Sequence, residues 1–314
     1  MFTISESLTA YLADCKANGF SVATTTQYAR IVSQYASFCE NKKQNPVLPA
    51  TIAAYKAYLS QDRGVKLSTV QYHLTVLRGF FAFCQRTLRV IQENPVLPDL
   101  DIGKKQLAAE RRPYGDKLMT EQEIKALVTA DSHRYAHAEL LPRNRAIVLL
   151  FVLSGLRNSE LRALTPADLS FGPEGHVHVE MGKGGKWRDV PFPTAAQDAM
   201  KAYIASGIRP SGLTDRDLLF GVGKTRNEWH EIDRFSMSTL VKRYVANATG
   251  HQGERSHALR HAFASTLLTN DIPISKIQGY LGHSSIRTTE IYASNLAPRR
   301  AVQEANAVLN GLFS

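Results

Sequence analysis

Apolar residues recur at intervals of three and four through most of the first hundred positions, which is the spacing of one face of an α-helix. Polar turns with prolines interrupt this pattern, as in NKKQNPVLP at 41–49, and NPVLPDL at 94–100 ends it. The pattern predicts four amphipathic helices that form an N-terminal helical domain over residues 1–100. The apolar positions are Leu8, Leu12 and Cys15, then Tyr28, Ile31, Val32, Tyr35, Phe38 and Cys39, then Ile52, Tyr55 and Leu59, then Val70, Leu74, Leu77, Phe81 and Cys84.

The segment at 101–117, DIGKKQLAAERRPYGDK, is basic and has no evident apolar face. We interpret it as an interdomain linker that lies along phosphates, with a plain solvated tether as an equal alternative. A second domain is expected over 118–314, because Thr120 and Glu123 have the capping-box spacing that opens a helix just after Leu118.

One stretch of this second domain alternates between apolar and polar residues instead. In HVHVEMGKGGKWRDVPF at 176–192, Val177, Val179 and Met181 alternate with polar residues up to a glycine-rich turn, after which WRDVPF resumes. A β-hairpin with Lys183 near its tip is predicted. The fold class is therefore expected to be mainly α with a small β-hairpin or sheet, in an α+β second domain.

The charge of the chain favours a polyanionic partner. The formal net charge is +10, and it divides into +4 for residues 1–100 (ten basic, six acidic), +2 for 101–117 (five, three) and +4 for 118–314 (23, 19). Lysines and arginines that neutralise phosphates release counterions and gain affinity, so nucleic acid is favoured over an acidic surface or a membrane. A partner that contacts both halves of the chain fits this distribution.

Cysteine spacing and hydropathy indicate a cytoplasmic protein. Cys15, Cys39 and Cys84 show no CxxC spacing and are odd in number, which argues against a disulfide framework and a zinc site. The longest apolar run, at 146–156, is too short to cross a bilayer, and the N-terminus lacks the features of a signal peptide.

Two polar clusters interrupt helical segments of the second domain. In LLFVLSGLRNSELRAL at 149–164, Arg157 follows Gly155, where it either forms a salt bridge with Glu160 or binds a phosphate, and by itself the salt bridge is favoured. In SHALRHAFASTLL at 256–268, His257 and Arg260 are three residues apart and so point to one side of a helix.

Metal and nucleotide cofactors are not expected. His257 and His261 have the spacing of a metalloprotease helix, but Ala258 stands where that motif needs glutamate, and no third ligand is evident. GVGKT at 221–225 is similar to part of a phosphate-binding loop, but Leu218 replaces its first glycine and a polar loop follows where a helix is required.

The segment LGHSSIRTTEIYA at 281–293 places His283 and Tyr292 nine residues apart. A single tyrosine at such a position usually belongs to a core. Here it accompanies two arginines, a hairpin lysine and two histidines on a basic chain. This set of residues favours a chemical role for its hydroxyl.

Together these segments resemble the tyrosine recombinases of the phage integrase and Xer type. SGLRNSEL is similar to the family's TGLRxSEL, GKGGKWRDVP to GKGxKxRxVP, HALRH to HxLRH, and LGHSSIRTTEIYA to LGHxxxxTTxxYxH, with Ala293 and Ser294 departing from the usual tail. The resemblance covers about residues 118–292, and less specifically the N-terminal helices resemble the SAM-like core-binding domain. It implies the catalytic residues Arg157, Lys183, His257, Arg260, His283 and the nucleophile Tyr292.

The chemistry implied by this resemblance needs these residue types. Two guanidiniums suit the nonbridging oxygens of an attacked phosphodiester, His257 assists the tyrosine, Lys183 protonates the leaving 5′-oxygen, and His283 donates a hydrogen bond to the phosphate. The reaction passes through a 3′-phosphotyrosyl intermediate and requires neither a metal ion nor a nucleotide.

The implied function is site-specific recombination of double-stranded DNA for integration or excision of a mobile element or for dimer resolution. The resemblance implies a two-domain clamp, four protomers that exchange strands through a Holliday junction, and accessory DNA-bending or directionality proteins on the nucleoid. A C-terminal exchange helix at about 299–314 passes to a neighbouring protomer, unless its apolar face folds back on its own domain. The alternatives are a type IB topoisomerase, which nicks and reseals as a monomer, and a DNA-binding factor of this fold without catalysis.

Overall fold

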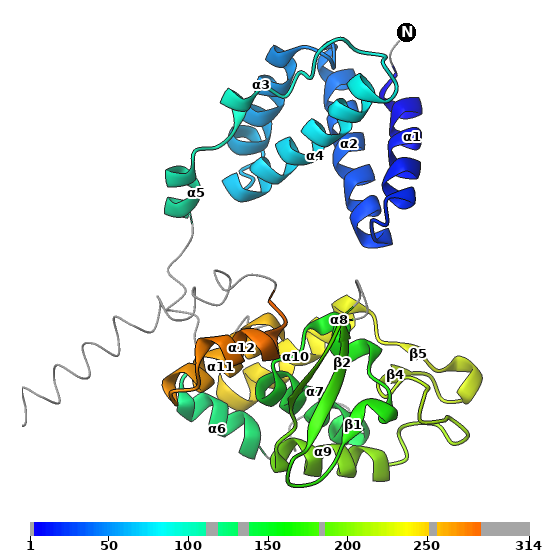
Figure 1. Ribbon diagram of the computed structural model, residues 1–314, viewed down its shortest axis with the longest axis vertical. Coiled ribbons are helices and arrows are strands. Elements are labelled where there is room, and N and C mark those ends of the chain that lie inside the picture. The colour runs from blue at the N-terminus through cyan, green and yellow to red at the C-terminus, as the bar shows by residue number, and fades with distance from the viewer. Residues whose placement is uncertain (1–2, 111–118, 131–137, 182–185, 251–255, 284–314) are drawn as a thin grey trace, which may run out of the picture. The chain divides into compact units, whose positions relative to one another are not determined.

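The computed structural model describes residues 3–110, 119–130, 138–181, 186–250 and 256–283. The chain divides into two compact units, Met1–Arg112 and Pro113–Ser314, each with its own hydrophobic core. Most elements are helices and the strands are few and short (Figure 1), so the mainly α fold with a small sheet is confirmed.

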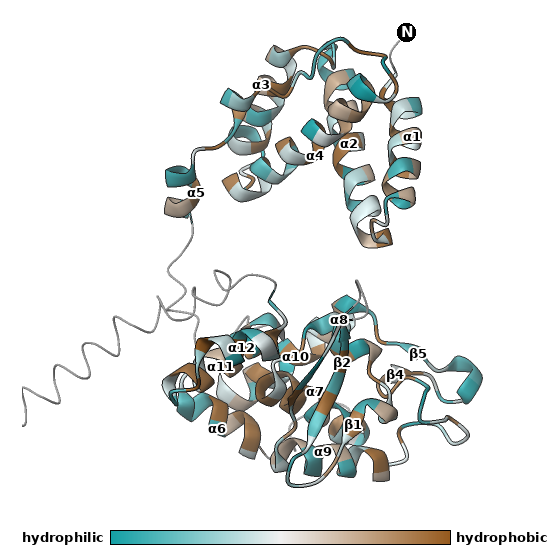
Figure 2. Ribbon diagram, viewed as in Figure 1, coloured by the Kyte–Doolittle hydropathy of each residue, from teal (hydrophilic) through white to brown (hydrophobic). Residues whose placement is uncertain are grey.

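The first unit is built from helices whose buried faces follow the apolar spacing of the sequence. Its main helices are α1 (Ile4–Ala17), α2 (Val22–Lys42), α3 (Pro49–Ala57), which a π-helical turn (Tyr58–Asp62) extends, and α4 (Leu67–Arg86). Hydrophilic and hydrophobic positions mix along α1 and α2 in Figure 2, as expected of amphipathic helices. The four predicted helices lie at these places. Their core includes Ile31, Tyr35, Ile52, Phe80 and Phe81, all fully buried.

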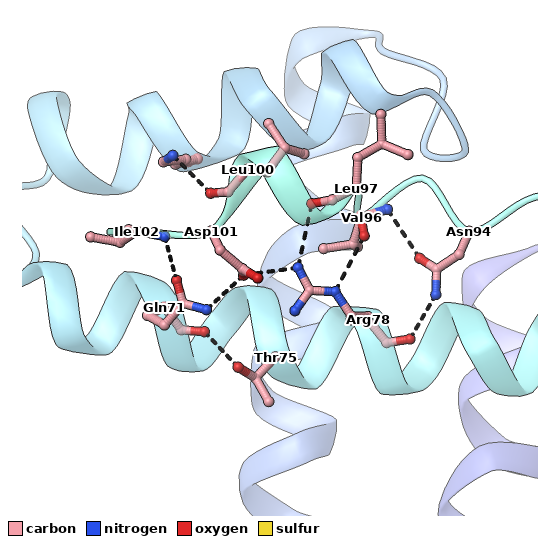
Figure 3. A network of polar contacts seen from close by, with 10 residues as sticks. Gln71, Thr75, Arg78, Asn94, Val96, Leu97, Leu100, Asp101 and Ile102 are labelled. Atoms are coloured by element: carbon pink, nitrogen blue, oxygen red, sulfur yellow. Dashed lines mark hydrogen bonds and ion pairs between the residues drawn. The ribbon is translucent and has the colours of Figure 1, made fainter. Parts of the chain in front are cut away.

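Polar side chains of α4 hold the segment that follows it (Figure 3). Arg78 forms an ion pair with Asp101 at 2.8 Å. Gln71 donates to the same carboxylate at 2.7 Å and accepts from the backbone N–H of Ile102 at 2.7 Å. Because these contacts satisfy main-chain groups of a segment without long regular structure, residues 94–102, which include a short 3₁₀ helix (Pro98–Leu100), belong to the first unit.

Part of the expected linker is a helix of the first unit. Helix α5 (Lys104–Glu110) ends at Glu110. The carboxylate of Glu110 accepts hydrogen bonds from the backbone N–H groups of Leu67 and Ser68, at 2.6 and 3.0 Å. These two groups start α4, whose first N–H groups have no partner within the helix. Leu107 packs against the core of the unit. Up to Glu110 the segment is therefore not a linker, and 111–117 lie outside the described residues.

The second unit surrounds one buried helix. Residues Ala146 to Val152 of α7 (Leu141–Ser154) are all buried, and α6 (Glu121–Thr129), α9 (Thr194–Ala205), α10 (Arg234–Thr249) and α11 (Ser256–Thr269) pack against it. The capping box of Thr120 and Glu123 starts α6 as predicted. The other helices of this unit among the described residues are α8 (Asn158–Ala163), α12 (Ile274–Leu281) and the 3₁₀ helices Ala138–Leu140, Pro166–Asp168 and Arg226–Glu228.

The predicted hairpin forms the larger of two small sheets in the described residues. Antiparallel strands β2 (His176–Met181) and β3 (Lys186–Pro191) pair with Val179 opposite Arg188, and β1 (Leu169–Ser170) adds to β2. Val177, Val179 and Val190 are buried on one face. Lys183 lies outside the described residues.

The segment GVGKT does not form a phosphate-binding loop. Its first two residues are strand β4 (Gly221–Val222), which pairs with β5 (His230–Glu231), and only a short 3₁₀ helix lies between them. Within the parts of the chain that the structure describes, no helix combines the length and hydrophobicity needed to cross a membrane.

Candidate active site

The first residues of the site follow a tight turn at the end of α7. Gly155 ends the helix with φ +64°, a left-handed conformation that favours glycine. A Cβ at this position would lie 2.3 Å from Cδ1 of Phe263 on α11. A larger residue would therefore clash with Phe263 and would also adopt this backbone conformation poorly. The turn places Arg157 at the start of α8.

Arg157 is held by a carboxylate and by a backbone carbonyl. Its backbone N–H and its Nη1 both donate to Glu160, each at 2.7 Å, and its Nη2 donates to the carbonyl of Gly282 at 2.7 Å. The salt bridge with Glu160 that the sequence favours is thus present. The side chain is also partly accessible, since 37% of it is exposed.

Arg260 lies deeper, on α11, and only 1% of the residue is exposed. Its Nη1 donates to the carbonyl of Gly155 at 2.6 Å, and its Nη2 donates to the carbonyl of Leu281. One guanidinium therefore connects the end of α7 with the end of α12. A buried charge needs such partners, since desolvation without hydrogen bonds is costly.

Three arginines converge on the carboxyl end of α12. The successive carbonyls of residues 280, 281 and 282 accept from Arg188 on β3, Arg260 on α11 and Arg157 at α8, respectively. The last carbonyls of a helix lack partners within it and carry partial negative charge, so guanidiniums stabilise this end. The arrangement fixes the backbone that leads directly into His283.

The pKa values of two histidines of the site are shifted toward the neutral form. Burial and the charges of Arg260 and Arg157 lower the pKa of His283 to about 4, and partial desolvation and the same two charges lower the pKa of His257, whose side chain is more exposed. The rings of His257 and His261 lie edge to face, with centroids 4.4 Å apart. A neutral imidazole both accepts a proton at one nitrogen and donates a hydrogen bond from the other.

His261 is expected to make the folded state sensitive to acid. Burial, His257 and Arg260 lower its pKa from 6.5 to about 3, so between these values the unfolded chain binds a proton that the folded chain does not. Stability therefore falls as the pH decreases through this window, by about 2 kcal/mol from this group between pH 7 and pH 5. Urea unfolding at both pH values measures the loss.

The variant His261→Asn should lose correspondingly less stability between pH 7 and pH 5 than the unmodified protein. His230→Asn is the matched control, because His230 is exposed on β5, and it should behave like the unmodified protein. Equal losses in the His261 variant and the unmodified protein would contradict the assignment.

The structure brings together four of the six residues singled out from the sequence. Arg157, His257, Arg260 and His283 lie close enough for the two arginines to act on both histidines. Lys183 and Tyr292 lie outside the described residues.

Two further residues belong to this cluster, and the sequence reasoning assigned no site role to either. The sequence predicts Glu160 only as a salt-bridge partner of Arg157, and it assigns no role to Arg188 within GKGGKWRDVP. Alternation along β3 places Arg188 on the same face as the buried Val190, and a buried arginine requires a partner. That alternation is the signal by which it was predictable.

Comparison with known proteins identifies the family. The model of the phage integrase family matches residues 117–299. The tyrosine recombinase XerD of Ralstonia nicotianae is 32% identical over 284 residues, covering 88% of this chain and 84% of its own, and XerC of Bacillus pumilus is 27% identical over 280 residues, covering 87% and 86%. The chain belongs to the phage integrase family and is an enzyme of the tyrosine recombinase class.

Solved structures share the fold. XerH site-specific recombinase bound to palindromic difH substrate, in a post-cleavage complex, aligns with a TM-score of 0.74 at 18% identity over 98% of this chain and 85% of the other. A lambda integrase dimer bound to a COC′ core site aligns with a TM-score of 0.65 at 18% identity over 93% and 95%.

Proposed function

We propose that this recombinase cleaves and rejoins double-stranded DNA at specific sites through a 3′-phosphotyrosyl intermediate at Tyr292. The observation that carries the proposal is the convergence of Arg157, Arg260, His257 and His283 around the end of α12. Two fixed positive charges beside two neutral imidazoles suit a phosphodiester that gains negative charge during an in-line attack.

In the proposed reaction, Arg157 and Arg260 stabilise the nonbridging oxygens of the scissile phosphate. The hydroxyl oxygen of Tyr292 attacks phosphorus and passes its proton to His257, whose lowered pKa keeps it neutral and able to accept. The bond from phosphorus to the 5′-oxygen breaks, and Lys183 gives that oxygen a proton. His283 donates a hydrogen bond to the phosphate.

Rejoining is the same reaction in reverse. A 5′-hydroxyl attacks the phosphotyrosyl bond, Lys183 takes back its proton and His257 returns one to Tyr292. The energy of the broken phosphodiester is kept in the phosphotyrosyl bond, so every step in this scheme is carried by side chains of the chain itself.

The remaining parts of the proposal concern assembly. The first unit is the core-binding domain, and with the catalytic unit it clamps duplex DNA. Four protomers exchange strands through a Holliday junction, with a helix at about 299–314 passed between neighbours. The net charge of +10 supports DNA as the partner, as do the DNA complexes of the structural neighbours. The biological role is integration or excision of a mobile element, or dimer resolution.

The test begins with a binding site selected from random duplexes and built into a nicked suicide substrate. We expect a covalent adduct in the presence of EDTA and without ATP, with the 3′-phosphate attached to the peptide that contains Tyr292. Recombinant product should require two sites. Absence of the adduct would contradict the proposal, and relaxation of plasmids without any paired-site product would favour the topoisomerase alternative.

A further inference from the structure

We propose that Arg188 is a positioning residue for strand cleavage, which orients Arg157 toward the phosphate through Glu160 and the end of α12. The inference rests on the proposed contact between Arg157 and the phosphate. It concerns a residue whose side chain cannot itself serve as a ligand for DNA.

All three nitrogen atoms of the Arg188 guanidinium are used within the protein. Nη1 and Nη2 donate to the two carboxylate oxygens of Glu160, at 3.0 and 2.8 Å, and Nε donates to the carbonyl of Tyr280 at 2.6 Å. Only 7% of the side chain is exposed. Arg188 therefore acts on the reaction only through the groups that it holds.

The carboxylate of Glu160 is shared by two arginines in a regular pattern. Oε1 accepts from Nη1 of Arg188 at 3.0 Å and from Nη1 of Arg157 at 2.7 Å. Oε2 accepts from Nη2 of Arg188 at 2.8 Å and from the backbone N–H of Arg157 at 2.7 Å. Each oxygen thus accepts one bond from each arginine, which uses the acceptor capacity of a carboxylate and fixes its plane.

The carboxyl group also stays ionised. Burial acts to raise the pKa of Glu160, but the hydrogen bonds and charge of Arg188 and the bonds from Arg157 hold this pKa below its ordinary value. Two guanidiniums against one carboxylate leave a net positive charge. Because Arg188 is buried and Arg157 is 37% exposed, that charge is presented at Arg157.

The contacts close into a ring that includes α12. Arg157 binds Glu160 and the carbonyl of Gly282, while Arg188 binds the same carboxylate and the carbonyl of Tyr280, two residues earlier. The guanidinium of Arg157 is therefore held at two points. Arg188 binds the carboxylate at the first point and, together with Arg260, binds the end of α12 beside the second. The ring also connects strand β3, which follows Lys183 by three residues in the chain, with the backbone before His283.

A lysine at position 188 keeps the charge but not the geometry. An ammonium is a point charge that cannot reproduce two parallel bonds to a carboxylate together with a third bond to a carbonyl. The carboxylate of Glu160 is then no longer held in one plane, and the guanidinium of Arg157 is no longer oriented toward the phosphate. Misplacement of a catalytic group by about 1 Å slows reactions by as much as about 100-fold, so we expect about 30-fold slower cleavage.

The experiment measures single-turnover cleavage of the nicked suicide substrate at saturating protein, beside equilibrium affinity for the intact site. Arg188→Lys should cleave about 30-fold more slowly, with site affinity within about threefold of the unmodified protein. The matched control is Arg162→Lys. Arg162 also pairs with a carboxylate, Glu231, at 2.7 Å and donates to a backbone carbonyl, that of Ile232, at 2.7 Å. Its cleavage should stay within about threefold of the unmodified protein.

A double-mutant cycle separates positioning from general damage to the fold. If Arg188 acts through Arg157, the variant with both arginines changed to lysine should cleave no more slowly than Arg157→Lys alone. Multiplied effects would overturn the inference. So would cleavage by Arg188→Lys at the unmodified rate, or equal loss of affinity, cleavage rate and folded fraction.

The same measurements distinguish failure of this inference from failure of the proposed function. If the unmodified protein forms no adduct, or if Arg157→Lys cleaves normally, the role proposed for Arg157 is wrong and Arg188 has nothing to position. If both behave as expected and the cycle is multiplicative, only the positioning role of Arg188 is wrong.

Discussion

Tyr292→Phe is expected to bind the selected DNA site with unchanged affinity and to form no covalent adduct. The substitution removes only the hydroxyl, so the attacking oxygen is lost while the aromatic ring is kept. Denaturing gel electrophoresis of the nicked suicide substrate measures the adduct, and an electrophoretic mobility shift measures binding.

Tyr280→Phe is the matched control for the loss of a tyrosine hydroxyl. Tyr280 lies on α12, partly buried, and the bond that it accepts from Arg188 is made by its backbone carbonyl, which the substitution keeps. This variant should form the adduct normally. A normal adduct in Tyr292→Phe, or its loss in Tyr280→Phe instead, would show that the nucleophile is assigned wrongly.

Arg260→Lys is expected to slow single-turnover cleavage by about 100-fold or more and also to destabilise the fold. The guanidinium of Arg260 donates to the carbonyls of Gly155 and Leu281 from an almost fully buried position. An ammonium does not span both carbonyls, and a buried acceptor that loses a charged donor costs about 2 kcal/mol. Cleavage assays and urea unfolding measure the two effects.

Arg157→Lys separates these two effects. It should slow cleavage to a similar extent, but with a smaller loss of stability, because its side chain is 37% exposed and water replaces lost partners there. Near-normal cleavage by both lysine variants would contradict the proposal that the two guanidiniums bind the phosphate. Equal losses of stability in Arg157→Lys and Arg260→Lys would contradict the expectation that the more buried arginine contributes more to stability.

Local patterns predict much of this architecture. The helices α1 to α4 have their apolar faces where the three- and four-residue spacing places them, because that spacing is a property of the helix itself. The capping box at Thr120 and the strands of the hairpin are equally local, since they depend on residues close together in the chain. Helix α5 was not predicted because the groups that it contacts, the first N–H groups of α4, are more than forty residues away in the chain.

The sequence by itself determined the mainly helical class, the hairpin, and the identity of the candidate residues, because residue type and spacing carry that information. It left open whether Arg157 forms a salt bridge or faces a ligand. The tertiary structure shows that the salt bridge is present while the side chain stays partly exposed. Only the tertiary structure decided that Arg157, Arg188 and Arg260 meet at three successive carbonyls at the carboxyl end of α12. The physical reason is that these contacts join residues 21 to 125 positions apart, so packing of α7, α11, α12 and β3 must bring them together before any of the bonds can form.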